Sequence, residues 1–163
     1  MIVQHETGET VNLEHIMKLG RHYSHEIGRV GEAAELFGER ASVELRREIF
    51  DCRPIGSICI GHVTEQVNGF LYYKPEIFSK TTLILYALAV VPHLQRQGIG
   101  ELLIKTFLNN IIDTQQARLV TIESSSKFIA AHRLYKKLGF SMSAKIDHYY
   151  NEHEHKHIYV KNL

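Results

Sequence analysis

The chain has 163 residues, of which 44% are hydrophobic and 23% charged, and its formal net charge is +1. This length suits one domain with a substantial core, and the near-neutral charge gives no footprint of a nucleic-acid or membrane-surface protein. Two cysteines, Cys52 and Cys59, do not suggest a disulfide framework, and Cys59 fits a buried apolar run. No stretch resembles a signal peptide or reaches the ~18 apolar residues of a membrane span, so we expect a cytoplasmic protein.

The first half of the chain predicts helices followed by a pair of strands. Val11, Ile16 and Leu19 recur at roughly helical spacing, which predicts a helix from residue 11 to about residue 27. Residues 28–38 contain three glycines and are either a helix broken at its ends or a mobile loop. The other elements expected here are a short strand at 1–4, a helix at 41–50 and strands at 55–63 and 66–74.

The second half alternates strands and helices. Residues 81–91 form a long apolar run of the kind that is buried on both faces of a sheet. The serines at 124–126 can cap a helix at 127–138, and Gly139 before Phe140 fits a left-handed stop. The remaining elements are a helix at 99–112, a strand at 118–122 and a closing hairpin of strands at 143–150 and 154–160. This order predicts one α+β domain on a mixed, mostly antiparallel sheet flanked by helices.

The stretch from residue 87 to residue 100 carries the clearest signal for a ligand. An apolar run stops at Pro92, a short polar turn follows, and Gly98 and Gly100 open a helix. The N–H groups at a helix start have no partner inside the helix and lie at the positive end of its dipole, so they attract phosphate. Glycine lets a ligand approach the backbone closely. The stretch therefore predicts a pyrophosphate cradle, with a plain strand-to-helix turn as the alternative.

Two runs together resemble the signatures of the GNAT N-acetyltransferase superfamily. Residues 95–100, Gln-Arg-Gln-Gly-Ile-Gly, are similar to its acetyl-CoA motif, Gln/Arg-x-x-Gly-x-Gly/Ala. Residues 131–140, Ala-His-Arg-Leu-Tyr-Lys-Lys-Leu-Gly-Phe, are similar to its second signature, Ala-x-x-Leu/Phe-Tyr-x-x-x-Gly-Phe, at the family's usual separation. The resemblance covers about residues 55–160. It implies a GNAT-like fold and acetyl-CoA as the co-substrate, with no metal.

The resemblance also implies how the domain is divided. Residues 1–163 are expected to be a single acetyltransferase domain, in which 1–54 shape the acceptor side and 55–163 hold the cofactor. The glycine turn would bind the pyrophosphate, and the preceding strand would bind the pantetheine arm and orient the thioester. The predicted cofactor-binding residues are Leu88, Ala89, Val90, Gln95, Arg96, Gln97, Gly98, Ile99, Gly100 and Ser126.

The second signature departs from the family at Phe128, where many members have an asparagine that contacts the cofactor. The hydroxyls of residues 124–126 are expected to substitute for it, and simple helix capping is the alternative. His132 and Arg133 either meet the phosphate end of the cofactor or form a solvated helix face.

By the same resemblance, Tyr135 stands where the family places a tyrosine general acid. A phenol of pKa ~10 is a plausible proton donor to a thiolate of pKa ~8.5, whereas the alternative is an aromatic that only packs on its helix face. The base is not assigned, because the strand at 83–90 offers no carboxylate. Tyr86 is its only polar side chain and the second predicted catalytic residue, while Glu123 is either a base or an exposed charge at a strand end.

His153, His155 and His157 alternate, so on one strand they share a face. Neighbours at i and i+2 lie ~6.6 Å apart, which permits zinc or nickel binding. A polar, solvent-facing hairpin is the alternative, and it agrees with the expectation of no metal. In the resembled family this hairpin can border the acceptor pocket or a dimer interface, so the resemblance makes a homodimer one of the expected assemblies.

The expected reaction is direct transfer of an acetyl group to an amine, since no cysteine lies in the motif region. The expected acceptor is a small molecule such as a polyamine, an amino acid or an aminoglycoside-like compound, with no nucleic-acid or membrane partner. A cluster of acidic side chains near the N-terminus either attracts this cation or forms a solvated face: Glu26, Glu32, Glu35 and Glu39. Two alternatives stay open. One is a non-catalytic acetyl-CoA-binding module, and the other is an enzyme that acetylates a protein or an aminoacyl-tRNA.

Overall fold

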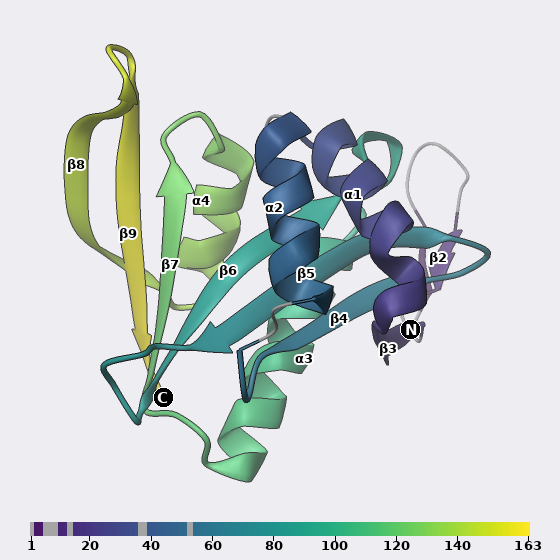
Figure 1. Ribbon diagram of the computed structural model, residues 1–163, viewed down its shortest axis with the longest axis horizontal. Helices are drawn as coiled ribbons and strands as arrows, with labels where there is room; N and C mark the ends of the chain where they lie inside the picture. Colours follow the sequence, from purple (N-terminus) through teal and green to yellow (C-terminus); the bar gives the residue numbers. More distant parts are fainter. Residues whose placement is uncertain (1, 5–9, 13–14, 36–38, 52–53) are drawn as a thin grey trace.

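The computed structural model describes residues 2–4, 10–12, 15–35, 39–51 and 54–163 (Figure 1). Seven strands form one sheet in the order β3-β4-β5-β6-β7-β9-β8, and all neighbours are antiparallel except β6 and β7. The strands are β3 (Ile16–Lys18), β4 (Ile58–Val63), β5 (Val67–Pro75), β6 (Thr82–Val90), β7 (Leu119–Ser125), β8 (Ser141–Asn151) and β9 (Glu154–Asn162). A separate two-stranded sheet pairs β1 (Ile2–Gln4) with β2 (Thr10–Asn12).

Helices cover both faces of the large sheet, with α1 and α2 on one side and α3 on the other (Figure 1). The helical elements are η1 (Arg21–Tyr23), α1 (Ser24–Ala33), α2 (Glu39–Phe50), η2 (Pro92–Leu94), α3 (Ile99–Thr114) and α4 (Ile129–Lys137). Successive side chains of a strand point to opposite faces. Leu71 and Tyr73 of β5 therefore join the core under α3, while Phe70 and Tyr72 join the core under α1 and α2.

The sheet opens between β6 and β7. These parallel strands pair only from Thr82 to Leu85, opposite Leu119 to Ile122. Beyond this point β6 remains paired with β5, and β7 remains paired with β9. The two strands diverge visibly in Figure 1. The last five residues of β6 thus expose one backbone edge, because no strand pairs with them on the β7 side.

The helix predicted at residues 11–27 is wrong up to residue 20, and only its end is helical, in η1 and the start of α1. Residues 10–12 belong to β2, and β3 pairs with β4 by placing Met17 opposite Gly61. Leu19 is buried, and its N–H donates to the Cys59 carbonyl at 2.9 Å. The backbone partners of residues 16–19 lie on β4, about 40 positions further along the chain. The spacing of three apolar residues contains no information about such distant partners.

The uncertain segment at residues 28–38 begins as regular helix, since α1 runs to Ala33. Residues 36–38 lie outside the described part of the chain. Gly28 has a packing role: a Cβ there would lie 2.8 Å from the Cδ of Arg46 on α2. The glycine therefore permits the close approach of α1 and α2 that the loop interpretation did not anticipate.

The other predicted elements are confirmed, with small shifts at their ends. Cys59 is fully buried, as predicted, while Cys52 lies outside the described residues. The C-terminus of α4 also matches its prediction: Gly139 has φ 82°, its N–H donates to the Lys136 carbonyl, and the Phe140 N–H donates to the Tyr135 carbonyl. These two bonds form a Schellman motif.

The start of α4 differs from the prediction of a serine cap. Phe128 occupies the N-cap position and makes no side-chain cap hydrogen bond. The Ser125 hydroxyl instead accepts a hydrogen bond from the Lys127 N–H at 3.3 Å, just before the helix. Among the described helices, none is long and apolar enough to cross a membrane.

Candidate active site

A cavity of about 1100 Å³ opens where β6 and β7 diverge. Its walls come from β6, the turn before α3, the first half of α3, the end of β7, α4 and the hairpin between β8 and β9. Of the residues predicted from sequence, the cavity brings together Leu88, Ala89, Val90, Gln95, Arg96, Gln97, Gly98, Gly100, Tyr86 and Tyr135. Ile99 and Ser126 do not line it.

The glycine turn is held by its own side chains and two left-handed residues. Arg96 has φ 66° and Gly98 has φ 91°. The Gln95 amide donates to the Val90 carbonyl at 3.0 Å, and the Gln97 amide donates to the His93 carbonyl at 3.1 Å. These two side-chain amides therefore stabilise the turn itself. From the sequence, both glutamines had been predicted to bind the cofactor.

The turn also has the properties that a pyrophosphate requires. A Cβ on Gly98 would meet no atom within 4 Å, so the space in front of this backbone is open. The N–H groups of the first turn of α3 have no acceptor inside the helix. The residues present thus fit a phosphate-bearing ligand that lies against the backbone.

Basic side chains from the turn, α3 and α4 line the cavity: Arg96, Lys105, Arg133 and Lys137. Glu101 sits among them and pairs with Lys105 at 2.8 Å and Lys137 at 2.6 Å. The hydrogen bonds from these two lysines lower the pKa of the Glu101 carboxyl. Lys105 and Lys137 were not found from the sequence, because only the folded chain brings α3 and α4 to one cavity.

Tyr135 points from α4 into the protein and is only 5% exposed. Burial raises the pKa of its phenol above the ordinary value, and a hydrogen bond with the Ser124 side chain acts in the opposite direction. Its ring lies 5.5 Å from that of Tyr159 and 6.2 Å from that of Phe140. Tyr135 thus packs against neighbouring aromatic rings and also lines the cavity, so its packing is compatible with the acid role, which stays a prediction.

The carboxylates at the other end of the cavity are already paired. Glu123 accepts a hydrogen bond from Lys156 at 2.7 Å, and Lys156 also lies over the Tyr149 ring at 3.6 Å. Lys156 keeps a raised pKa, because its hydrogen bond to Glu123 and its contact with Tyr149 outweigh the opposing effect of burial. The Glu123 carboxylate is therefore already engaged by a side chain of β9.

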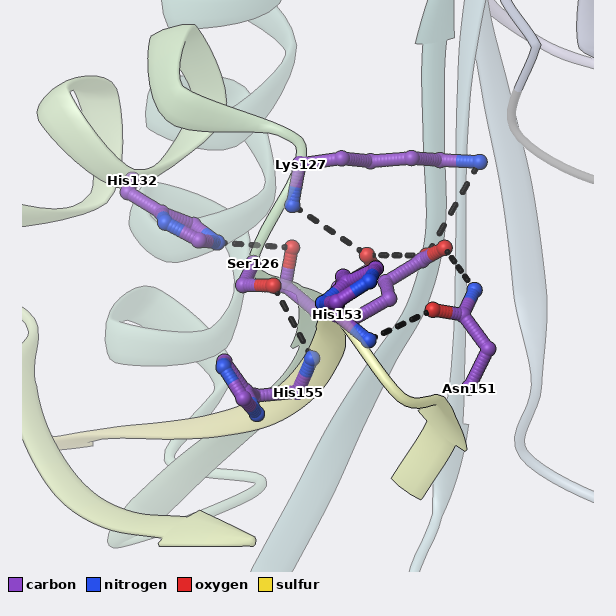
Figure 2. A network of polar contacts seen from close by, with 9 residues as sticks. Ser126, Lys127, His132, Asn151, His153 and His155 are labelled. Carbon is purple, nitrogen blue, oxygen red and sulfur yellow. Dashed lines mark hydrogen bonds and ion pairs between the residues drawn. The ribbon is translucent and has the colours of Figure 1, made fainter. Parts of the chain in front are cut away.

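Glu154 forms a second polar network with neighbours that include Lys127 and Asn151, both labelled in Figure 2. It hydrogen-bonds Ser125 and Asn151 and lies 3.9 Å from the Lys127 Nζ. Ser126 belongs to this junction: its hydroxyl accepts from the His155 N–H at 2.9 Å (Figure 2). The hydroxyl expected to bind the cofactor is therefore engaged with β9.

Tyr86 is 41% exposed and lines the cavity near this end. The Lys74 Nζ lies 4.0 Å from the centre of its ring. The predicted acidic cluster does not line the cavity. Within it, Glu26 accepts a hydrogen bond from the Val67 N–H at 2.6 Å, Glu32 and Glu35 are exposed, and the Glu39 side chain lies outside the described part.

The alternating histidines do not gather around a common point. His155 lies 3.2 Å from Asp147 and next to the His148 ring, whereas the His157 ring lies 4.9 Å from that of His132 on α4. In the part of the chain that the structure describes, no group of three or more His, Cys, Asp or Glu side chains is arranged to hold a metal ion.

A model of the acetyltransferase (GNAT) domain matches residues 54–142, more than half of the chain. The chain belongs to the GNAT acetyltransferase family. This family uses acetyl-CoA, and its matched region contains both the glycine turn and Tyr135. A search among curated proteins returns no match.

Solved structures agree with the GNAT fold. A GNAT-family protein from Desulfovibrio desulfuricans superposes with a TM-score of 0.78 at 25% identity, covering 90% of this chain and 97% of that one. The ribosomal-protein-S18-alanine N-acetyltransferase from Escherichia coli gives a TM-score of 0.75 at 18% identity, covering 91% and 92%. An aminoglycoside 6'-N-acetyltransferase complexed with coenzyme A gives 0.72 at 16% identity, covering 90% and 96%. The last two similarities concern the fold alone.

Proposed function

We propose that this GNAT protein is an acetyl-CoA-dependent N-acetyltransferase that acetylates the amine of a small molecule by direct transfer. One observation carries the proposal: a single cavity is lined by the glycine turn, the exposed backbone edge of β6 and Tyr135. Acetyl-CoA supplies an activated acetyl thioester. The chain must hold its phosphates, orient its carbonyl and assist the departure of the thiolate.

The phosphates would lie at the glycine turn. The N–H groups that begin α3 and the open space at Gly98 would hold the pyrophosphate, with Arg96 adding charge. The unpaired edge of β6 at Leu88, Ala89 and Val90 would hydrogen-bond the amides of the pantetheine arm. A backbone N–H on this edge would also stabilise the oxyanion that forms as the amine attacks.

Tyr135 would assist the thiolate. Its raised pKa keeps the phenol protonated throughout the neutral range, so the proton is always present for donation. The same raised pKa makes complete transfer to sulfur less favourable. Tyr135 therefore needs help from neighbouring groups to act as an acid.

The amine would enter at the end of the cavity lined by Tyr86, Glu123, Tyr150 and Asn151. Residues from β8 bound this end, which favours an acceptor small enough to fit inside over an extended protein tail. Because Glu123 is paired with Lys156, we assign removal of the ammonium proton to water ordered beside Tyr86. Direct transfer is supported by the position of Cys59, which is fully buried in the core on the α1–α2 side.

The pairing of both carboxylates at the acceptor end favours one competing function, a module that binds acetyl-CoA without catalysis. A panel of amines with detection of the released thiol separates the two. We expect acetyl-CoA to raise the melting temperature and one class of small amines to release thiol. A temperature shift without amine-dependent release would indicate the binding module. No shift at millimolar acetyl-CoA would contradict both functions, and activity only with a peptide or aminoacyl-tRNA would overturn the small-molecule assignment.

A further inference from the structure

Tyr86 stands at an irregularity of β6. The consecutive residues Tyr72 and Tyr73 of β5 lie opposite Ala87 and Leu85, so Tyr86 has no residue opposite it on β5. One extra residue on one strand is a β-bulge, which re-aims the side chains next to it. Leu85 accordingly belongs to the core under α3, whereas Ala87 belongs to the core under α1 and α2. The bulge thus reverses which face of the sheet the odd-numbered residues of β6 take.

The same residue marks the point where the sheet opens. Leu85 is the last residue of β6 that pairs with β7, opposite Ile122, and Tyr86 is the next residue along the chain. The Tyr86 ring lies 6.1 Å from the ring of Tyr72, which belongs to the core under α1 and α2, and Tyr86 also lines the cavity. Tyr86 therefore places an aromatic ring at the opening between β6 and β7, on the side of the sheet that α1 and α2 cover (Figure 1).

A lysine outside the cavity contacts this ring. The Lys74 Nζ lies 4.0 Å from the centre of the Tyr86 ring, a distance at which the ring face attracts an ammonium group. The Lys74 side chain is only 21% exposed, and its Nζ donates a hydrogen bond to the Glu48 Oε1 of α2 at 2.6 Å. Leu45 and Ile49, on either side of Glu48, are buried in the core under α2, so this carboxylate projects from a fixed helix. Neither Lys74 nor Glu48 lines the cavity, so any effect on the reaction must pass through Tyr86.

We propose that Lys74 and Glu48 are positioning residues for the acceptor amine. Glu48 anchors the Lys74 ammonium, and this ammonium fixes the Tyr86 ring at the opening between β6 and β7. The inference rests on the proposed function, in which water beside Tyr86 takes the proton of the ammonium group. A half-exposed tyrosine without such contacts samples several rotamers, and immobilising it when the amine binds costs free energy. A ring that is fixed beforehand removes this cost, and Glu48 also neutralises a charge that would otherwise repel a protonated amine.

The first test observes Tyr86 itself and does not depend on activity. Aromatic ¹H–¹³C NMR spectra of the full chain with labelled tyrosine report on each ring, and the Tyr86→Phe variant assigns the Tyr86 signal. We expect Glu48→Gln to shift this signal in the same direction as Lys74→Met, because both release the ammonium from its place over the ring. Lys74→Arg keeps a cation there and should leave the signal nearer its natural position. A Tyr86 signal that does not move in Glu48→Gln would overturn the proposal.

The second test asks whether Lys74 acts through the ring. The assay is thiol release from acetyl-CoA with the small amine that reacts fastest in the panel. We expect Lys74→Met to lower kcat/KM for this amine by about three- to tenfold, the range expected when a cation is removed from an aromatic ring. The KM for acetyl-CoA should stay unchanged, and Lys74→Arg should remain within about twofold of the natural chain. In a Tyr86→Leu background, Lys74→Met should have no further effect, because the ring on which Lys74 acts is gone.

Glu44→Gln on α2 and Lys80→Met are matched controls, since both residues are exposed and do not line the cavity. Equal losses from Lys74→Met in the natural and Tyr86→Leu chains would indicate a general structural role and overturn the inference, as would a Lys74→Met variant no slower than Lys80→Met. If Lys74→Met does not fold, Glu48→Gln takes its place in both tests. If no amine of the panel releases thiol, the proposed function fails, whereas the Tyr86 signal still decides whether Lys74 and Glu48 fix the ring.

Discussion

Gly98→Ala tests whether the glycine turn holds the phosphates through a close approach of the backbone. Gly98 has φ 91°, a conformation that costs alanine about 1–2 kcal/mol. For a chain of this size, that strain lowers the melting temperature by roughly 2–8 °C. The added Cβ meets no protein atom within 4 Å, so it would project into the space assigned to the ligand.

The effect on binding follows from linkage. At a concentration of 100 times its Kd, acetyl-CoA should stabilise the natural chain by about 2.7 kcal/mol, or roughly 5–10 °C. Losing one or two charge-assisted hydrogen bonds of about 1.5–3 kcal/mol each weakens binding by about tenfold to more than a hundredfold. At the same concentration, a hundredfold loss leaves about 0.4 kcal/mol of stabilisation, a shift of only about 1 °C.

The assay is thermal unfolding with and without acetyl-CoA, and Gly56→Ala is the matched control. Gly56 has φ 82° and does not line the cavity, so alanine there imposes similar backbone strain, with an added contact 3.0 Å from the Pro75 Cγ. We expect both variants to melt earlier, and Gly98→Ala alone to lose its response to acetyl-CoA. A full response in Gly98→Ala would refute the cradle.

Two further predictions concern α4. Tyr135→Phe should lower kcat by about a hundredfold, a loss in the range of general acid catalysis. The shift of the melting temperature with acetyl-CoA should stay the same. Unaltered turnover would leave Tyr135 with a packing role alone. Folding stability should decrease as the pH falls below about 6.5. Burial lowers the pKa values of His132 and His157 in the folded state, so the unfolded chain binds more protons in that range. Urea unfolding at pH 7.5 and 5.5 measures the change in the free energy of unfolding between these two pH values. If this change is as large in His132→Gln as in the natural chain, His132 does not contribute to it.

The glycine turn and the end of α4 were predictable because their signals are local. Gly98 and Gly139 both adopt positive φ, which glycine accepts without strain. The turn is followed at once by an amphipathic helix, and the bonds that close α4 join residues at most five positions apart. Short windows of sequence hold all of this information.

The site was predicted less completely, because its polar contacts join distant segments. Glu123 was a candidate base until the fold placed Lys156 against it, 33 positions away. Ser126 was assigned to the cofactor, yet its hydroxyl meets β9. His132 was expected at the cofactor or on a solvated face of its helix, yet its ring is buried and contacts the Ser124 hydroxyl of β7.

The sequence by itself determined the order of elements from β4 to β9, the glycine turn and the family resemblance. These depend on backbone preferences and on periodic burial within single elements, which each segment carries on its own. Only the tertiary structure decided the strands β2 and β3, the divergence of β6 from β7 and the pairing of Glu101, Glu123 and Glu154 with lysines around the cavity. Those features depend on which distant backbone and side-chain groups become neighbours when the sheet closes, and no local pattern contains that information.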